Sequence, residues 1–288
     1  MGVGEWVGKS CSLDGWQQDA RCMPICCDLL IRPISSNEFE AIDSVVMACA
    51  YAAQNKLGRL CEEQVYENDL AARLRAEGFG DVHTQVAVRV TLRGFSKVYR
   101  LDLVVNEMVY ELKAVECLVR AHDAQAYNYG ALLDIDRVKL LNFGGPRVEG
   151  KLRRCPFGTL DRSCVTLDHS RWKALSPRCQ LLATDAEACF REWGGFLDAH
   201  LFEEALVAFN GGELGCMRRL PVTRDALQLG HHRTALHAND VGFVVTAMHE
   251  DTTAHEKQLR ALLDVLPIRG WQWINIHHSE MRFVTVTR

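Results

Sequence analysis

Residues 99–116 read YRLDLVVNEMVYELKAVE, two apolar and largely β-branched runs that meet at a short polar turn. This pattern predicts an antiparallel strand pair with the turn at its centre. The pair contains Asp102, Glu111 and Lys113, which are unusual residues for the middle of a sheet. A hairpin of this kind places Asp102 roughly opposite Glu111. Glu111 and Lys113 are two residues apart and therefore share one face of the sheet.

The two carboxylates repel one another at this spacing, and burying them unpaired is costly. A divalent cation removes that cost, because Mg²⁺ and Mn²⁺ prefer hard oxygen ligands from one or two acidic side chains. Lys113 beside such an ion would orient or help to deprotonate a water and would stabilise charge on a phosphate during hydrolysis. The spacing alone is equally compatible with an ordinary ion pair at a half-solvated sheet edge.

Helical periodicity flanks the strand pair on both sides. Upstream, we expect a helix with Ser36 as its N-cap and Gly58 as its end. A second helix, stopped by Gly78, should bury Leu60, Val65, Leu70 and Leu74. Strands are expected over 83–92, 98–105 and 108–116, followed by a helix over 120–134 and a strand over 137–143. This order predicts one α/β unit over residues 38–154.

Two helices carry further polar side chains that helical spacing could turn toward the strand pair. Glu63 lies in the helix before the sheet, on the face of Tyr66 and Glu67, and could supply a third carboxylate. In the helix after the sheet, His122, Gln125 and Tyr129 follow one helical face. A solvated helix surface or a capped helix start would explain this second set equally well.

The arrangement of Asp102, Glu111-Leu112-Lys113 and Gln125-x-x-x-Tyr129 resembles the PD-(D/E)XK nuclease superfamily. More narrowly, LGRLCEEQVYENDL at 57–70, with Glu63-x-x-Tyr66, resembles the opening of the GxxExxY family. VYELKAVE, the His and Gln of the following helix, and LLNFG are similar to that family's later motifs. The family's glycine before its first motif is displaced, since Leu60 and Cys61 stand near that point. The resemblance spans about residues 40–154.

The resemblance implies a restriction-endonuclease-like αβββαβ core and Mg²⁺-dependent (or Mn²⁺-dependent) hydrolysis of phosphodiester bonds in DNA or RNA. Asp102 and Glu111 would hold the metal with help from Glu63, and Lys113 would act on the water or the transition state. Gln125 would join the catalytic set on the phosphate side. The auxiliary residues would be Tyr66, His122 and Tyr129. Apart from the resemblance, the nucleic-acid contacts are expected to be Arg100 and, in the basic stretch RVEGKLRR at 147–154, Arg153 and Arg154; this stretch could also be a solvated linker.

The chain repeats this pattern. Adding 133 to positions 99–142 gives a gap-free match in which Arg100 falls on Arg233 and Asn142 on Asn275. Adding 136 aligns the upstream helices, with Gly58 on Gly194. The three-residue difference between the offsets fits a change of loop length. We therefore expect a tandem duplication of one α/β core.

The second copy lacks the polar set. Asp102 falls on Ala235, Glu111 on Val244, Lys113 on Thr246, Glu63 on Ala199 and Tyr129 on Leu262. The second copy is thus predicted to be degenerate, with at most one active site per chain. Its candidate phosphate contacts are Arg218, Arg219, His231–Arg233 and His277-His278. Trp271 and Trp273 could stack on bases, although their alternation favours packing in the core.

Composition sets outer bounds. The chain has 288 residues and a net charge of -4, which argues against a general polyanion binder without excluding a basic cleft. Its 12 cysteines lack paired metal-ligand spacing and are expected to be reduced structural thiols. With no signal-peptide pattern and no apolar run of the ~18–20 residues that span a bilayer, we expect a cytoplasmic protein.

The predicted organisation is a loose leader over 1–37, a nuclease-like domain over 38–154, a linker over 155–185 and the degenerate copy over 186–288. The leading hypothesis is a nuclease whose partner is nucleic acid, DNA being favoured over RNA, with no membrane. Homo-oligomerisation is left open. The alternatives are a catalytically inactive nucleic-acid-binding or protein-interaction module that keeps the fold, and a structural ion-pair network in a domain of another role.

Overall fold

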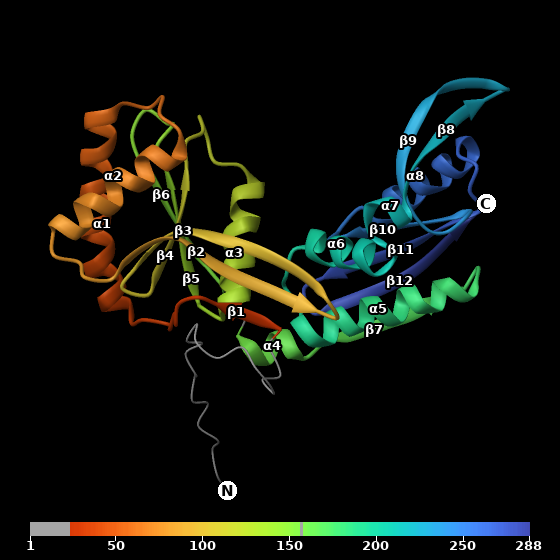
Figure 1. The fold of residues 1–288 in the computed structure, drawn as a ribbon, viewed down its shortest axis with the longest axis horizontal. Coiled ribbons are helices and arrows are strands. Elements are labelled where there is room, and N and C mark those ends of the chain that lie inside the picture. Colours follow the sequence, from red (N-terminus) through yellow and green to blue (C-terminus); the bar gives the residue numbers. More distant parts are fainter. Residues whose placement is uncertain (1–23, 156–157) are drawn as a thin grey trace, which may run out of the picture. The chain divides into compact units, whose positions relative to one another are not determined.

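The computed structural model describes residues 24–155 and 158–288, which form two compact units (Figure 1). Unit 1 comprises the chain up to Thr91 together with Ser96–Gly158. Unit 2 comprises Thr159–Arg288 and the short segment Leu92–Phe95. The part of the predicted leader over 1–23 lies outside the described residues. Among the described residues, no helix has the length and apolar character needed to cross a bilayer.

Unit 1 contains a six-stranded mixed sheet in the strand order β1-β2-β3-β4-β5-β6, and helices pack against this sheet. Strands β4 and β5 run parallel through the connecting helix α3, whereas β3–β4 and β5–β6 are antiparallel pairs. The elements in chain order are β1 (Ile25–Cys27), α1 (Ser36–Leu57), α2 (Glu63–Ala76), β2 (Val82–Leu92), β3 (Phe95–Val105), β4 (Met108–Lys113), α3 (Arg120–Leu133), β5 (Arg137–Asn142) and β6 (Glu149–Arg154).

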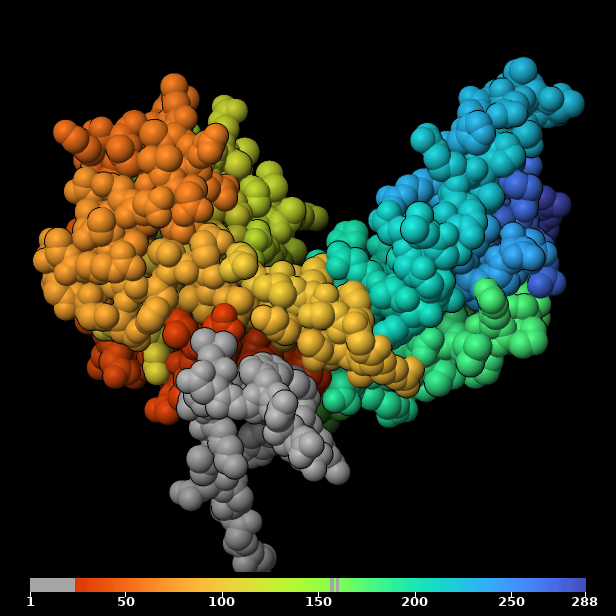
Figure 2. All heavy atoms as spheres, in the orientation of Figure 1, coloured from red at the N-terminus to blue at the C-terminus, as the bar shows by residue number. Residues whose placement is uncertain are grey.

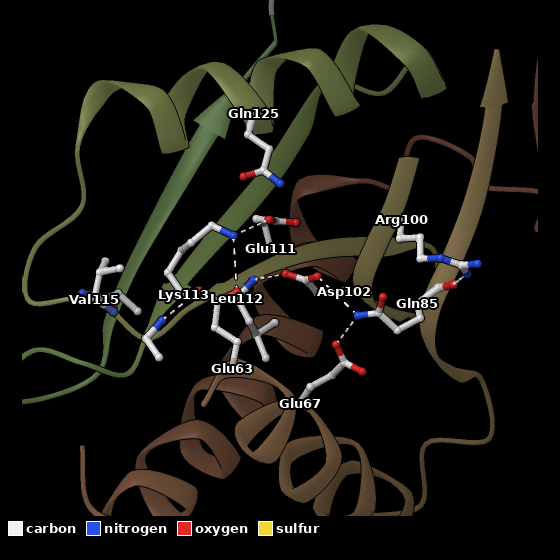
Figure 3. Close-up of polar contacts among 12 residues, drawn as sticks. Glu63, Glu67, Gln85, Arg100, Asp102, Glu111, Leu112, Lys113, Val115 and Gln125 are labelled. Atoms are coloured by element: carbon white, nitrogen blue, oxygen red, sulfur yellow. Dashed lines mark hydrogen bonds and ion pairs between the residues drawn. The ribbon is translucent and has the colours of Figure 1, made fainter. Parts of the chain in front are cut away.

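The period of two in β4 assigns its residues to opposite faces of the sheet. Tyr110 and Leu112 join the hydrophobic core that α1 and α2 form on one face. That core includes Tyr66, whose ring stacks on Phe143 with centroids 4.5 Å apart. Glu111 therefore points to the other face, which α3 covers (Figure 3). The fold thus places the acidic residue away from the larger core.

Several expectations for this unit require correction. The N-cap of α1 is Ser35, one residue before the predicted Ser36, and it forms a capping box with Glu38. Leu60 and Val65 are exposed, at 96% and 41%, because α2 starts only at Glu63 and turns Tyr66 inward. The basic stretch at 149–154 is the edge strand β6. Part of the expected leader is strand β1, which pairs with β2.

Unit 2 repeats the architecture with strand order β7-β12-β11-β10-β9-β8, and β10–β11 is its parallel pair. Its elements are α4 (Thr159–Ser163), β7 (Thr166–Arg171), α5 (Pro177–Trp193), α6 (Ala199–Phe209), α7 (Gly212–Cys216), β8 (Met217–Arg224), β9 (Leu227–Ala238), β10 (Val241–Thr246), α8 (Thr252–Val265), β11 (Gly270–His277) and β12 (Glu280–Thr287). The predicted α/β fold with two similar cores is confirmed.

The residues expected to form a linker, 155–185, contain α4, β7 and the first half of α5. Strand β7 pairs in parallel with β12 at the edge of the second sheet. Helix α5 buries a stripe at helical spacing that includes Leu182, Ala186 and Phe190. This stripe shows that the helical period begins ahead of residue 186, where we expected the second copy to start.

Matched hydrogen bonds support the two offsets. The Asn142 Oδ1 atom accepts from the Val115 amide at 3.1 Å, and the Asn275 Oδ1 atom accepts from the Met248 amide at 2.9 Å. Both pairs are related by 133. Likewise, Gly58 and Gly194, related by 136, end α1 and α5 with positive φ values of 77° and 82°. The scaffold is thus repeated down to single side-chain contacts.

The buried Asn142 side chain ties the chain after β4 to β5, since Oδ1 also accepts from the Gly144 amide at 3.2 Å. Replacing Asn142 with Ala leaves two backbone amides without this acceptor. We expect Asn142→Ala to lower the free energy of unfolding by about 2 kcal/mol, measured by thermal unfolding. The exposed Asn68→Ala variant is the control. A midpoint for Asn142→Ala equal to that of the wild type would contradict this role.

Candidate active site

The β3–β4 hairpin brings the two predicted carboxylates together. Asn106 and Glu107 both have positive φ, 43° and 70°, as a two-residue hairpin turn requires. Leu103 pairs with Tyr110, so Asp102 and Glu111 come next along the two strands. Their carboxyl groups lie close enough to share a hydrogen bond when one is protonated. The backbone amide of Leu112 fixes Asp102 by donating to its Oδ2 atom at 2.8 Å.

Glu111 is the most deeply placed of these groups, with 1% of its surface exposed. Its Oε1 atom accepts from the Lys113 ammonium at 2.5 Å, but its buried Oε2 atom has no hydrogen-bond partner. Burial and the neighbouring Asp102 raise the pKa of Glu111 to about 8, and Lys113 opposes the shift. A buried, unpartnered carboxylate oxygen beside a second carboxylate is a position that a cation stabilises.

Lys113 lies between two acids. Its ammonium donates to Glu111 and is 3.7 Å from a carboxylate oxygen of Glu63. Burial lowers the pKa of Lys113, but the charges of Glu111, Glu63 and Asp102 outweigh burial, so the net pKa is raised. Lys113 therefore stays charged at neutral pH. Glu63 is also held by the Ala114 amide, which donates to its Oε1 atom at 3.3 Å.

Two further residues shape the site, and one of them was missed by the sequence reasoning. Gln85 donates through Nε2 to Glu67 Oε2 at 2.5 Å and weakly to Asp102 Oδ1 at 3.5 Å (Figure 3). Gln85 has a φ of 54°, which turns its side chain away from the alternation of its strand. Glu67 is buried, and burial raises its pKa. No pattern of residue types signals this positive φ at Gln85.

A cavity of about 530 Å³ opens beside these groups. Its walls include four carboxylic acids but no arginine or lysine. The lining residues are Leu60, Cys61, Glu62, Glu63, Gln64, Glu67, Gln85, Asp102 and Ala114. An anionic substrate would be repelled from such a cavity unless a cation were bound there.

Helix α3 contributes Gln125, whose side chain reaches toward Glu111 in Figure 3. Its Nε2 atom donates to the Tyr129 hydroxyl at 3.0 Å, which in turn donates to the Arg100 carbonyl at 3.0 Å. Tyr129 is 4% exposed, and burial raises its pKa. Gln125 is thus placed over the carboxylates by a buried tyrosine.

The remaining predicted residues make contacts within the fold, and their predicted roles in the site stay predictions. His122 accepts from the Val119 amide at 3.1 Å and so caps the start of α3. The Tyr66 hydroxyl donates to the Gly58 carbonyl at 2.7 Å, within the core. Arg153 forms an ion pair with Asp123 at 2.6 Å, and Arg100 donates to the Gln85 carbonyl at 3.2 Å. Arg154 is exposed on β6.

The donor set fits a cation held partly by the protein. Within the described ranges, no three acidic, histidine or cysteine side chains are gathered into a complete ligand cage. Asp102, which lines the cavity, and the neighbouring buried Glu111, with its orphaned oxygen, offer two carboxylates. This arrangement suits Mg²⁺ or Mn²⁺, which are bound through one or two carboxylates together with waters and substrate phosphate.

Comparison with known proteins identifies this part of the chain. Residues 40–155 match the model of the PD-(D/E)XK nuclease superfamily, so they form a domain of that superfamily. The prediction is confirmed at this level, whereas the narrower GxxExxY assignment stays a prediction. Neither the search of curated proteins nor the search of solved structures found a match.

The raised pKa of Glu111 predicts a pH dependence of stability in metal-free buffer. The pKa of Glu111 is 4.5 in the unfolded chain and is raised to about 8 in the folded chain. Between these values the unfolded state binds fewer protons, so stability falls as the pH rises through this window. We expect Glu111→Gln to abolish this part of the fall, measured by thermal unfolding at a series of pH values.

The exposed Glu116→Gln variant serves as the control and should behave as the wild type does. Adding Mg²⁺ near pH 8 should restore stability to the wild type but not to Glu111→Gln, because only the wild type offers the carboxylate. Identical pH profiles for the wild type and Glu111→Gln would refute the assignment.

Proposed function

We propose that unit 1 is a metal-dependent nuclease that hydrolyses phosphodiester bonds of nucleic acid, DNA being favoured over RNA. The observation that carries this proposal is the buried, unpartnered Oε2 atom of Glu111, which lies beside Asp102 and on the same side chain that binds Lys113. It occurs inside a domain of a nuclease superfamily. A buried carboxylate oxygen without a protein partner is a place where a bound ion or water is expected.

Asp102 and Glu111 would hold Mg²⁺ or Mn²⁺, with Glu63 assisting from α2. When bound, the ion neutralises charge on the phosphate and lowers the pKa of a water. The acidic cavity favours binding of the cation before binding of the phosphodiester. With Glu62, Glu63 and Glu67 on its walls, it repels a phosphodiester until the negative charge has been partly neutralised.

Lys113 would supply the positive charge next to the reacting phosphate. Its raised pKa keeps it protonated, so it acts as a donor rather than as a base at neutral pH. The N–H groups of Lys113 that do not bind Glu111 would donate to the phosphate oxygen or the attacking water, where charge develops in the transition state.

Gln125 would orient the phosphate from the opposite side of the site. It is a neutral donor at the end of a chain of hydrogen bonds through Tyr129 to the β3 backbone. Gln85 would help to fix the position of Asp102, because its side-chain amide donates hydrogen bonds to both Asp102 and Glu67. These contacts limit the motion of both carboxylates and thereby favour one productive geometry.

Catalysis is assigned to unit 1 alone. In unit 2, the position of Lys113 is taken by Thr246, whose hydroxyl donates to Asn275 Oδ1 at 2.7 Å and accepts from the Trp273 indole at 2.8 Å. These bonds are internal to the fold. Ala235 and Val244 stand where a metal would need carboxylates.

The test is cleavage of single- and double-stranded DNA and RNA with Mg²⁺ or Mn²⁺. We expect Lys113→Ala and Asp102→Asn each to lower the rate by about 10²–10³-fold, as the loss of one electrostatic contact to the transition state does. Thr246→Val, the change at the matching position of unit 2, should cleave as the wild type does.

Thermal unfolding of each variant must show that it is folded. A wild type that cleaves none of these substrates faster than Lys113→Ala would overturn the proposal. In that event, binding without cleavage would support an inactive nucleic-acid-binding module.

A further inference from the structure

The two-stranded ribbon of β8 and β9 in unit 2 has a charge pattern that the fold does not require. Residues 217–238 contain four arginines and one acidic residue, although the whole chain carries a net charge of -4. The outer part of the ribbon stands clear of the rest of unit 2 in the space-filling view (Figure 2). In this outer part, the residues of both β8 and β9 are exposed or half-buried.

The register divides the ribbon into two faces. Residues directly opposite each other in an antiparallel pair project on the same side. Leu220 and Val222 pack against the hydrophobic core that α8 completes, so their side is the inner face. Arg219 lies opposite Arg233, and Pro221 opposite His231. By alternation these four residues share the outer face, which turns away from that core.

The outer face contains a pair of like charges, Arg219 and Arg233, directly across the two strands. Such a pair destabilises a sheet. Arg233 is partly offset by Glu213 at 2.8 Å, but both side chains are well exposed, so solvent screens this ion pair strongly. Within the described part of the chain, no carboxylate pairs with Arg219. Arg218 differs, because its guanidinium donates to carbonyls at the end of α7.

We propose that this outer face binds duplex DNA, with Arg219 and Arg233 contacting phosphates and His231 next to Arg233 on the same face of β9. The inference rests on the proposed function only in taking nucleic acid as the substrate. The major groove of B-form DNA, about 12 Å wide, admits a two-stranded ribbon. The deep, narrow major groove of A-form RNA does not admit protein side chains.

The tip of the ribbon adds a second feature. Leu227 and Leu229 are 60% and 51% exposed, next to a turn formed by Asp225 and Ala226 with positive φ. In the register, Leu227 lies opposite Arg224, on the side of Leu220 and Val222, and Leu229 lies at a register shift, so neither leucine belongs to the outer face. Phosphate contacts from Arg219 and Arg233 would position the outer face along the DNA.

The experiment uses the full chain carrying Lys113→Ala, in EDTA, so that binding is measured without cleavage. Fluorescence anisotropy gives the dissociation constant for a short DNA duplex over a range of salt. The added double change Arg219→Gln/Arg233→Gln should weaken binding about tenfold and reduce the salt slope by about two. Arg191→Gln, an exposed arginine on α5, is the matched control and should change neither quantity.

Duplex RNA and heparin are the comparison ligands. Unchanged DNA affinity in the folded double variant would overturn the inference, as would an equal loss for DNA, RNA and heparin, which would mark a general polyanion surface. The proposed function fails separately. A chain that binds DNA through the ribbon but never cuts refutes the nuclease alone, and one that cuts with an unaffected ribbon variant refutes the ribbon alone.

Discussion

The arrangement of unit 1 depends on one electrostatic constraint, the placement of Asp102 and Glu111 side by side in a buried part of a sheet. Neither can be fully ionised there without a compensating charge, and the protein supplies only part of that charge through Lys113. The amides of Leu112 and Gln85 and the cover of α3 all act around these two carboxylates. The rest of that charge is supplied by a proton in metal-free buffer, and by a divalent cation in the function proposed for unit 1.

Unit 2 shows what the same scaffold becomes when this constraint is removed. Its strand order and parallel pair are kept, and so is the asparagine that joins the parallel strands. At the centre of this sheet, the Thr246 hydroxyl forms hydrogen bonds with both Asn275 and Trp273. The charges of unit 1 are therefore not needed to form the sheet, which argues that they serve a ligand. Charge is concentrated instead at the ribbon, far along the chain from the acidic site.

The predictable parts were those that follow a short period. The hairpin could be located from alternation, and once it was located, Asp102 and Glu111 had to meet, because a period of two leaves no other arrangement. The duplication was visible because Asn142 and Asn275 occupy equivalent positions. Gln85 was not predictable, since its role arises from a positive φ that no residue type specifies. Leu60 was misjudged because hydrophobicity alone does not reveal where a helix begins, and α5 was partly missed because its stripe is built from small residues and cysteines as much as from large apolar ones.

The paired asparagines have a consequence for motion. The segment that leaves β4 is a loop, and loops beside active sites are commonly among the first parts of a protein to open. Here the Val115 amide is bound by a side chain that is 0% exposed, and the Met248 amide is bound in the same way in the other unit. Opening either loop therefore requires breaking a buried side-chain hydrogen bond to the neighbouring parallel strand. The segment that follows Lys113 is thus tied to the neighbouring parallel strand, which limits the motion of the backbone next to the carboxylates.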